Sequence, residues 1–305
     1  MTAHAVSPAL ASFSIDLDAQ WDYAKPGESE RRFRTELAKW PSEDPQALII
    51  ATQIARTQGL RREFADAQAT LDAIESRLGN APSHVRVRYL LERGRAFNSS
   101  GSPERALPLF ADALSLAQCD GDEFYAIDAA HMLGITAPPT ERLDWSRKGL
   151  AMAERATAPR AKRWLAPLYN NIGQTYLEQG DYAPALDYFR KALPAWESRG
   201  DPGSVRVAHW MIGRAQRALG QLDDAEKTQR ALLAEYEKIG EPYGYVYEEL
   251  AEIALARGDA SAAQPWAAKA HAALEDDAYP QANEPGRLAR LDRIAQGRLP
   301  ATAKP

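Results

Sequence analysis

The stretch NNIGQTYLEQGDYAPALDYFRKAL, Asn170–Leu193, decides the fold. Its first part continues a helix predicted over residues 164–179, on which apolar and small residues share one face. They are Tyr169, Ile172, Gly173 and Tyr176. Gly180 can adopt the left-handed backbone that ends a helix, and Asp181 is a favourable N-cap for a second one. The stretch therefore predicts two antiparallel helices joined by a short turn.

The two predicted helices carry small residues where they would cross. Gly173 and Ala185 let the backbones approach closely, while Tyr176 and Phe189 fill the space beside the contact. Pro184 falls in the first turn of the second helix, where its missing N–H costs little. The spacing thus indicates a tightly packed helical hairpin.

The same arrangement recurs along the chain. Residues that correspond to Gly173 recur at steps of 39, 40, 39, 40 and 38 positions. They are Ala55, Gly94, Gly134, Gly173, Gly213 and Ala251. One hairpin cannot bury its outer face, so regular repetition of this kind predicts hairpins stacked into an array.

This pattern of small and aromatic residues resembles the tetratricopeptide repeat, although the period is longer than the family's usual period of about 34 residues. It is similar to the longer-period bacterial members. The resemblance covers residues 44–274 and implies an all-α, right-handed superhelical solenoid of about six hairpins. It also implies a non-catalytic protein that holds a partner segment in a concave groove.

The two ends of the chain are predicted to form capping elements, since terminal repeats of a solenoid need polar outer faces. Residues 1–43 are predicted to be a disordered start followed by a helix over Pro26–Trp40, with Phe33 and Leu37 inward. Residues 275–305 are predicted to hold a helix over Glu284–Gly297 and a tail. The first dozen residues and residues 299–305 are expected to be disordered.

The composition of the chain and the motifs that it lacks argue against several classes of protein. The chain has 305 residues, a net charge of −5 and one cysteine, Cys119. The acidic balance argues against a general nucleic-acid binder, and the lack of cysteine pairs favours a reducing compartment. There is no long apolar run, no secretory leader, and no phosphate-loop, dinucleotide or zinc-protease motif. We therefore expect a cytoplasmic bacterial protein with no membrane span, no nucleic-acid partner, no metal and no cofactor. Residues 119–123, CDGDE, are interpreted as a turn between helices.

In an array of this kind, the first helices of the hairpins line the groove, and one of their faces points into it. Applying one offset to every copy gives a set of candidate groove residues. They are Arg56, Arg88, Arg95, Asn98, Asp128, His131, Asn170, Gln174, Trp210, Arg214, Arg217, Tyr245, Glu248 and Glu252.

Five arginines in this set suggest an acidic or extended partner segment, because a guanidinium can bind a carboxylate with two parallel hydrogen bonds. Trp210 and Arg214 lie four residues apart and would share one face. The alternative is that the arginines are solvated and paired with nearby acids. Glu248, Glu249 and Glu252 are interpreted as a solvated acidic face, with catalytic pairing of these carboxylates as the alternative. Replacing Arg214 and Arg217 together by alanine is expected to weaken binding and leave the fold intact.

Three functions remain open at this point. The first is an adaptor or scaffold that binds a protein or peptide, with no chemistry of its own. The second is a sensor that binds a small signal, such as a peptide or a sugar. The third is an enzyme with an unfamiliar site around Asp128, His131, Asn170 and Trp210. The partner, the pathway, the oligomeric state and the pitch of the superhelix are left open.

Overall fold

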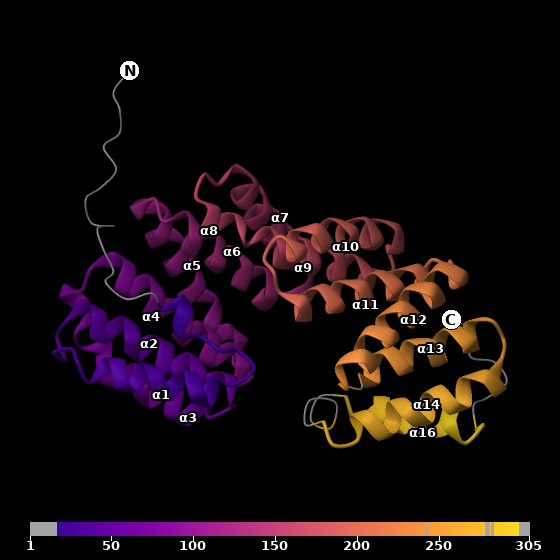
Figure 1. The fold of residues 1–305 in the computed structure, drawn as a ribbon. Helices are drawn as coiled ribbons and strands as arrows, with labels where there is room; N and C mark the ends of the chain where they lie inside the picture. The colour runs from indigo at the N-terminus through magenta and orange to yellow at the C-terminus, as the bar shows by residue number, and fades with distance from the viewer. Residues whose placement is uncertain (1–16, 242, 278–280, 282–283, 299–305) are drawn as a thin grey trace. The chain divides into compact units, whose positions relative to one another are not determined.

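The computed structural model describes residues 17–241, 243–277, 281 and 284–298. Within these ranges the ordered secondary structure is helical and no strand is present (Figure 1). The predicted all-helical class is confirmed. The chain forms two compact units, residues 1–168 and 169–305. The expected disorder of residues 1–12 and 299–305 lies outside the described residues.

The first unit begins with a single 3-10 turn, η2 (Asp18–Gln20), followed by α-helices that are joined by short turns. The helices are α1 (Pro26–Leu37), α2 (Pro45–Leu60), α3 (Phe64–Glu75), α4 (Ser83–Ser99), α5 (Pro103–Asp120), α6 (Glu123–Thr136), α7 (Pro139–Arg155) and the short α8 (Pro159–Lys162). A second 3-10 turn, η3 (Leu78–Asn80), connects α3 to α4.

The helix α9 (Leu165–Gln179) contains the division between the units, and the rest of the second unit follows it. Its helices are α10 (Tyr182–Glu197), α11 (Pro202–Ala218), α12 (Leu222–Ile239), α13 (Gly244–Ala256), α14 (Ala260–Leu274) and α16 (Pro285–Ala295).

Each stretch predicted as a hairpin is a pair of consecutive helices. The pairs are α2–α3, α4–α5 and α6–α7 in the first unit, and α9–α10, α11–α12 and α13–α14 in the second. The observed helix α1 ends at Leu37, three residues before the predicted end, and α16 spans Pro285–Ala295 within the predicted range. The division of the chain into residues 1–43, 44–274 and 275–305 stays a prediction.

Glycine at the crossing of a hairpin makes room for an aromatic ring. A Cβ placed on Gly173 would lie 2.6 Å from Cε1 of Phe189, and one on Gly94 would lie 2.5 Å from Cε1 of Phe110. Both phenylalanines are fully buried. These distances are far shorter than the ordinary carbon–carbon contact of about 3.5–4.0 Å. The predicted close approach is therefore present, with the ring lying directly against the glycine.

The turns inside the hairpins also follow the predicted residue types. Gly180 directly follows α9. Its φ of 80° is the left-handed conformation that was expected of it. Asp181 stands at the N-cap of α10, as predicted, although its side chain makes no capping hydrogen bond there. In the α2–α3 hairpin the left-handed position is held by Arg62, with φ of 64°. The turn expected at residues 119–123 is present but is confined to Gly121, which is left-handed, and Asp122, which caps α6; Cys119 and Asp120 belong to α5.

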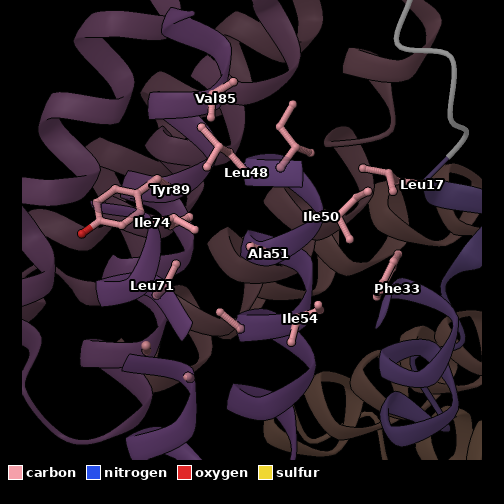
Figure 2. Close-up of a cluster of buried hydrophobic side chains, with 14 residues drawn as sticks. Leu17, Phe33, Leu48, Ile50, Ala51, Ile54, Leu71, Ile74, Val85 and Tyr89 are labelled. Atoms are coloured by element: carbon pink, nitrogen blue, oxygen red, sulfur yellow. The ribbon is translucent and has the colours of Figure 1, made fainter. Parts of the chain in front are cut away.

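The core of the first unit fills the space between α1, α2, α3 and α4 (Figure 2). Leu71 and Ile74 of α3 pack on one side of α2, and Ile50 of α2 points toward α1. Phe33 of α1 is fully buried, as predicted, and Leu37 is partly buried against the same cluster. At the other end of the chain, the predicted inner face of α16 packs on α14. Leu291 and Ile294 are about 1% exposed and Leu288 is partly buried beside them.

Candidate functional site

The first-unit face, as we call it, is formed by α2, α4 and α6 around four charged residues, Arg56, Glu92, Arg95 and Asp128. Glu92 of α4 is shared by two arginines: its Oε2 lies 3.2 Å from Nη1 of Arg56 and its Oε1 lies 2.6 Å from Nη1 of Arg95. Arg95 also donates to Oδ1 of Asp128. The result is an alternating row of charges that links three first helices.

These charges are mostly removed from water. Glu92 is 7% exposed and Asp128 is 4% exposed. Burial alone lowers the pKa of Arg95, but the carboxylates of Asp128 and Glu92 outweigh it and raise that pKa above its ordinary value. Asp128 was predicted to point into an open groove. It is instead covered, because Arg95 reaches across from α4 and binds it.

Other predicted residues of this unit lie near the row. Burial lowers the pKa of His131 to about 4, so its ring is neutral at pH 7. The ring centre of His131 lies 4.9 Å from that of Trp164. The guanidinium carbon of Arg88 lies 4.8 Å from the ring centre of Tyr125. Asn98 is half-buried near the end of α4.

A segment of the chain itself occupies the first-unit face. Trp21 donates from Nε1 to Oε1 of Gln53 on α2, at 3.0 Å. The guanidinium carbon of Arg56 lies 5.9 Å from the ring centre of Tyr23. Asp18 accepts from Nε and Nη2 of Arg160, both at 3.1 Å. The sequence pattern gave no sign of this, because the segment has no periodicity.

The second-unit face is formed by α11, α13 and α16. Trp210 of α11 donates from Nε1 to the carbonyl oxygen of Tyr245 at 3.2 Å, and the two rings meet edge to face at 5.8 Å. The guanidinium carbon of Arg214 lies 5.3 Å from the ring centre of Trp210. The structure thus brings Trp210 and Arg214 together on one surface, as the spacing of four residues predicts.

Glu249 of α13 lies opposite two arginines of α11, Arg214 and Arg217. Arg217 donates to it from Nε at 2.7 Å and from Nη2 at 3.1 Å. Nε of Arg214 lies 3.7 Å from Oε1 of the same carboxylate, which is too long for a hydrogen bond. Glu249 is 4% exposed. Arg217 therefore compensates a buried charge, whereas Arg214 makes no side-chain hydrogen bond to the described residues.

The two predicted glutamates of α13 pair with arginines of α16. Oε2 of Glu248 lies 3.3 Å from Nη1 of Arg287, and Glu252 accepts from Nε and Nη2 of Arg290 at 3.0 and 2.8 Å. Their side chains are 16% and 18% exposed. Burial raises the pKa of Glu248 to about 7. The expected solvated acidic face was wrong, because α16 covers these carboxylates.

Aromatic rings extend the second-unit face toward α12. The rings of Tyr236 and Tyr243 stack at 4.8 Å, and Tyr243 lies 5.2 Å from Tyr245. Guanidinium carbons stand over two of these rings, Arg206 at 5.1 Å from Tyr236 and Arg287 at 5.1 Å from Tyr245. Burial raises the pKa of Tyr243 to about 12, so its hydroxyl stays protonated at neutral pH.

The predicted residues of α9 are half-buried. Gln174 donates from Nε2 to Oε1 of Glu178 at 2.7 Å, on the same helix. Asn170 lies one turn earlier.

The two faces contain several functional residues that the sequence reasoning missed. These are Glu92, Arg160, Arg287 and Arg290. A signal existed for two of them. Arg287 and Arg290 are three residues apart, as Arg214 and Arg217 are, so the same offset applied to the capping helix would have found them.

Among the described residues, no three histidine, cysteine, aspartate or glutamate side chains gather as a metal ion would require. In the same part of the chain, no helix combines the length and the apolar character that crossing a membrane demands.

The sequence and the fold of this chain are similar to those of known proteins. Residues 166–194, which span the α9–α10 hairpin, match the model of the tetratricopeptide repeat family. The described fold is similar to a chain of the APC/C heterotetramer Cut9–Hcn1, with a TM-score of 0.68, 11% identity, and coverage of 96% of this chain and 51% of that one. It is also similar to a signal-transduction ATPase with a tetratricopeptide repeat sensor from Pyrococcus horikoshii, with a TM-score of 0.63, 14% identity, and coverage of 90% and 42%.

Residues 166–194 therefore form a tetratricopeptide repeat, and the chain has the fold of tetratricopeptide repeat proteins, as the spacing of its small and aromatic residues predicts. An uncharacterized protein of Treponema pallidum (strain Nichols) is 24% identical to it over 214 residues. That match covers 68% of this chain and 51% of the other, so the chain spans about half the length of this curated relative. Proteins with this fold typically take part in protein interactions.

Proposed function

We propose that this protein is a non-catalytic adaptor that binds an extended, acidic segment of a partner protein on the second-unit face. The observation that carries the proposal is the pair formed by Trp210 and Arg214. An indole ring and a guanidinium share one surface, and both side chains are only half-buried. Tryptophan and arginine are the residue types most enriched among binding hot spots.

The charges of the second-unit face support an acidic partner. Four arginines, at positions 214, 217, 287 and 290, face three glutamates, at positions 248, 249 and 252. Because the pKa of Glu248 is raised to about 7, this carboxyl is only partly ionised at neutral pH, which leaves the face more positive still. Three of the arginines are engaged by carboxylates at hydrogen-bond distance or close to it. Arg214 keeps its donors for a ligand, and a guanidinium offers five of them.

The aromatic rings support an extended segment with apolar side chains. Trp210, Tyr245 and Tyr243 form a continuous row of ring contacts across α11 and the start of α13. Rings of this kind supply contact area at low cost in side-chain entropy. We infer that an apolar side chain of the partner packs beside Trp210 and that a carboxylate of the same segment pairs with Arg214.

The test uses peptides selected from a random library on the purified chain, with dissociation constants measured by fluorescence anisotropy. Trp210→Ala and Arg214→Ala should each weaken binding by about 2 kcal/mol, or roughly thirtyfold, if they are hot spots. Arg190→Ala, an exposed substitution on α10, is the matched control and should change nothing. Selected peptides that lack carboxylates, or that bind Arg214→Ala as tightly as the unaltered chain, would contradict the proposal.

Arg217 is not suitable for this test. Its removal leaves the buried carboxylate of Glu249 without its hydrogen-bonded partner, so loss of binding and loss of folding would be confounded. The expectation that Arg214 and Arg217 could be replaced together without harm to the fold is accordingly replaced by the single substitution of Arg214.

A further inference from the structure

The segment Leu17–Tyr23 lies on the first unit as a ligand would. Three contacts, which we call its anchors, hold it there, and the first of them is apolar. Leu17 is 6% exposed and belongs to the core cluster of the unit. Figure 2 shows its side chain beside Ile50 and near Phe33. Leu17 thus packs among apolar side chains of α1 and α2.

The second anchor is ionic and reaches a distant part of the sequence. The carboxylate of Asp18 receives two parallel hydrogen bonds from Arg160, which stands on α8, 142 positions further on. The guanidinium of Arg160 is held in place by a ring, since its central carbon lies 3.8 Å from the ring centre of Phe124. A guanidinium that is oriented by a ring and exposes its fork is well suited to recognise a carboxylate.

The third anchor is aromatic. The rings of Trp21 and Tyr23 stack at 4.6 Å with an interplanar angle of 5°, and Trp21 meets Phe33 edge to face at 5.2 Å. Gln53 fixes the indole by accepting its N–H, and Arg56 stands over the ring of Tyr23. Arg56 belongs to the residues that the repeat pattern assigns to the groove.

The buried Leu17 and the hydrogen bonds between Asp22 and Ser29 hold the segment most firmly, whereas its ionic contact and Tyr23 are exposed. The side chains of Asp18 and Arg160 are 53% and 39% exposed, and exposed ion pairs contribute little stability. Tyr23 is 61% exposed. The segment is a single 3-10 turn, η2, followed by an extended stretch. Its only deeply buried side chain is Leu17, within the described part of the segment.

We infer that the first-unit face is a second peptide site. Its ligand carries an apolar residue, an adjacent aspartate and an aromatic residue three positions after the aspartate, and Leu17–Tyr23 is an internal competitor that such a ligand displaces. The inference rests on the proposed function, because it takes binding of partner segments by the repeats as given. It adds the location of a further site and the chemistry of its ligand. It also explains why the chain's own segment covers this site when no ligand is bound.

Competition of this kind has a measurable signature. A tethered occupant lowers the apparent affinity for a free ligand by the fraction of molecules in which the face is open. Weakening the tethered segment should therefore raise the affinity for an added peptide, although no residue that contacts the added peptide has changed. A purely structural role of Leu17–Tyr23 predicts no such gain.

The probe is a fluorescein-labelled peptide with the sequence of residues 17–25, LDAQWDYAK, and binding to the full chain is followed by anisotropy. We expect Leu17→Ser/Trp21→Ala to bind the probe at least tenfold more tightly than the unaltered chain. Asp18→Lys, which replaces only an exposed side chain, should give a smaller gain in the same direction. Helical circular dichroism and thermal melting check that each variant is folded.

A charge exchange then tests the geometry. In the Leu17→Ser/Trp21→Ala background, Arg160→Glu should weaken probe binding by about threefold to fivefold, as expected of an exposed ion pair, and the peptide LKAQWDYAK should recover it. Lys162→Glu, an exposed change on the same short helix, is the matched control and should have little effect. Recovery by the exchanged pair cannot result from damage to the fold.

Three outcomes would overturn the inference. The first is equal probe binding by the unaltered chain and by both weakened variants. The second is probe binding that ignores Arg160→Glu. The third is dimerisation of the unaltered chain that Asp18→Lys abolishes, since this would assign the face to a second copy. None of these results affects the Trp210 and Arg214 measurements, so failure here and failure of the proposed function are distinguishable.

Discussion

Gly173→Ala is expected to destabilise the second unit, although alanine is the better helix former. The added Cβ would lie 2.6 Å from Cε1, 2.8 Å from Cδ1 and 3.1 Å from Cζ of Phe189. Ordinary carbon contacts begin near 3.5 Å, so the ring or the helix must move by close to 1 Å. Phe189 is fully buried, and protein interiors are close-packed, so a shift of its ring disturbs the side chains around it.

The magnitude follows from two opposing terms. Overpacking a core position of this kind typically costs about 1–3 kcal/mol. Replacing an interior helical glycine by alanine returns up to about 1 kcal/mol. The net loss is therefore roughly 1 kcal/mol, within about 1 kcal/mol either side of that value, and Gly173→Leu should lose more. Gly59→Ala is the matched control, because a Cβ on this helical residue of α2 meets nothing within 4 Å.

Urea unfolding followed by circular dichroism measures both variants. The midpoint should fall for Gly173→Ala and stay level or rise for Gly59→Ala. In a Phe189→Leu background, the cost of Gly173→Ala should shrink, because the atoms that collide with the new Cβ are gone. A Gly173→Ala protein that unfolds at or above the urea concentration of the unaltered chain would refute the close packing of Gly173 against Phe189.

Arg62→Gly should stabilise the first unit by up to about 1 kcal/mol in the same urea assay, because φ of 64° suits glycine better than arginine; an unchanged or lower midpoint would contradict this. Burial raises the pKa of Glu248 to about 7, above the 4.5 of an ordinary glutamate, so the folded state binds the extra proton between these values. Stability from this group is full below about pH 4.5 and is lost as pH rises through 7, by on the order of 2 kcal/mol. Glu248→Gln should flatten that slope in melts recorded from pH 5 to 8. Arg217→Ala should cost about 2 kcal/mol or more, because Glu249 is left buried and unpaired, whereas Arg214→Ala should cost less than about 1 kcal/mol; equal losses would show that Glu249 does not depend on Arg217.

The fold was predictable because its determinants are local. A helical hairpin needs a small residue at the crossing, a large one beside it and a residue that tolerates the left-handed turn. Gly173, Phe189 and Gly180 meet these needs within seventeen positions of one another. The less regular copy, α2–α3, was found by its spacing, although Arg62 stands where four other copies have a left-handed glycine, at positions 101, 180, 220 and 258.

The candidate faces were only partly predictable, because their contacts join residues far apart in the sequence. A helical offset says which way a side chain points, and it placed Trp210 and Arg214 together. It does not say that Glu249 stands opposite Arg217, 32 positions away, or that Arg95 covers Asp128. It is also silent on Leu17–Tyr23, whose position depends on a pocket and on Arg160 rather than on a repeat.

The ion pairs of both faces join the first helices of neighbouring hairpins, as Glu92 does for α2 and α4 and Glu249 does for α11 and α13. The glycine–phenylalanine contacts, by contrast, close a hairpin on itself. Unfolding cooperativity in repeat proteins depends on the balance between the stability within a repeat and the coupling between repeats. Salt weakens the coupling through its partly exposed arginines and leaves the apolar contacts intact. Ionic strength should therefore tune how many hairpins melt together within each unit, from one broad cooperative block at low salt toward fraying of single end hairpins at high salt.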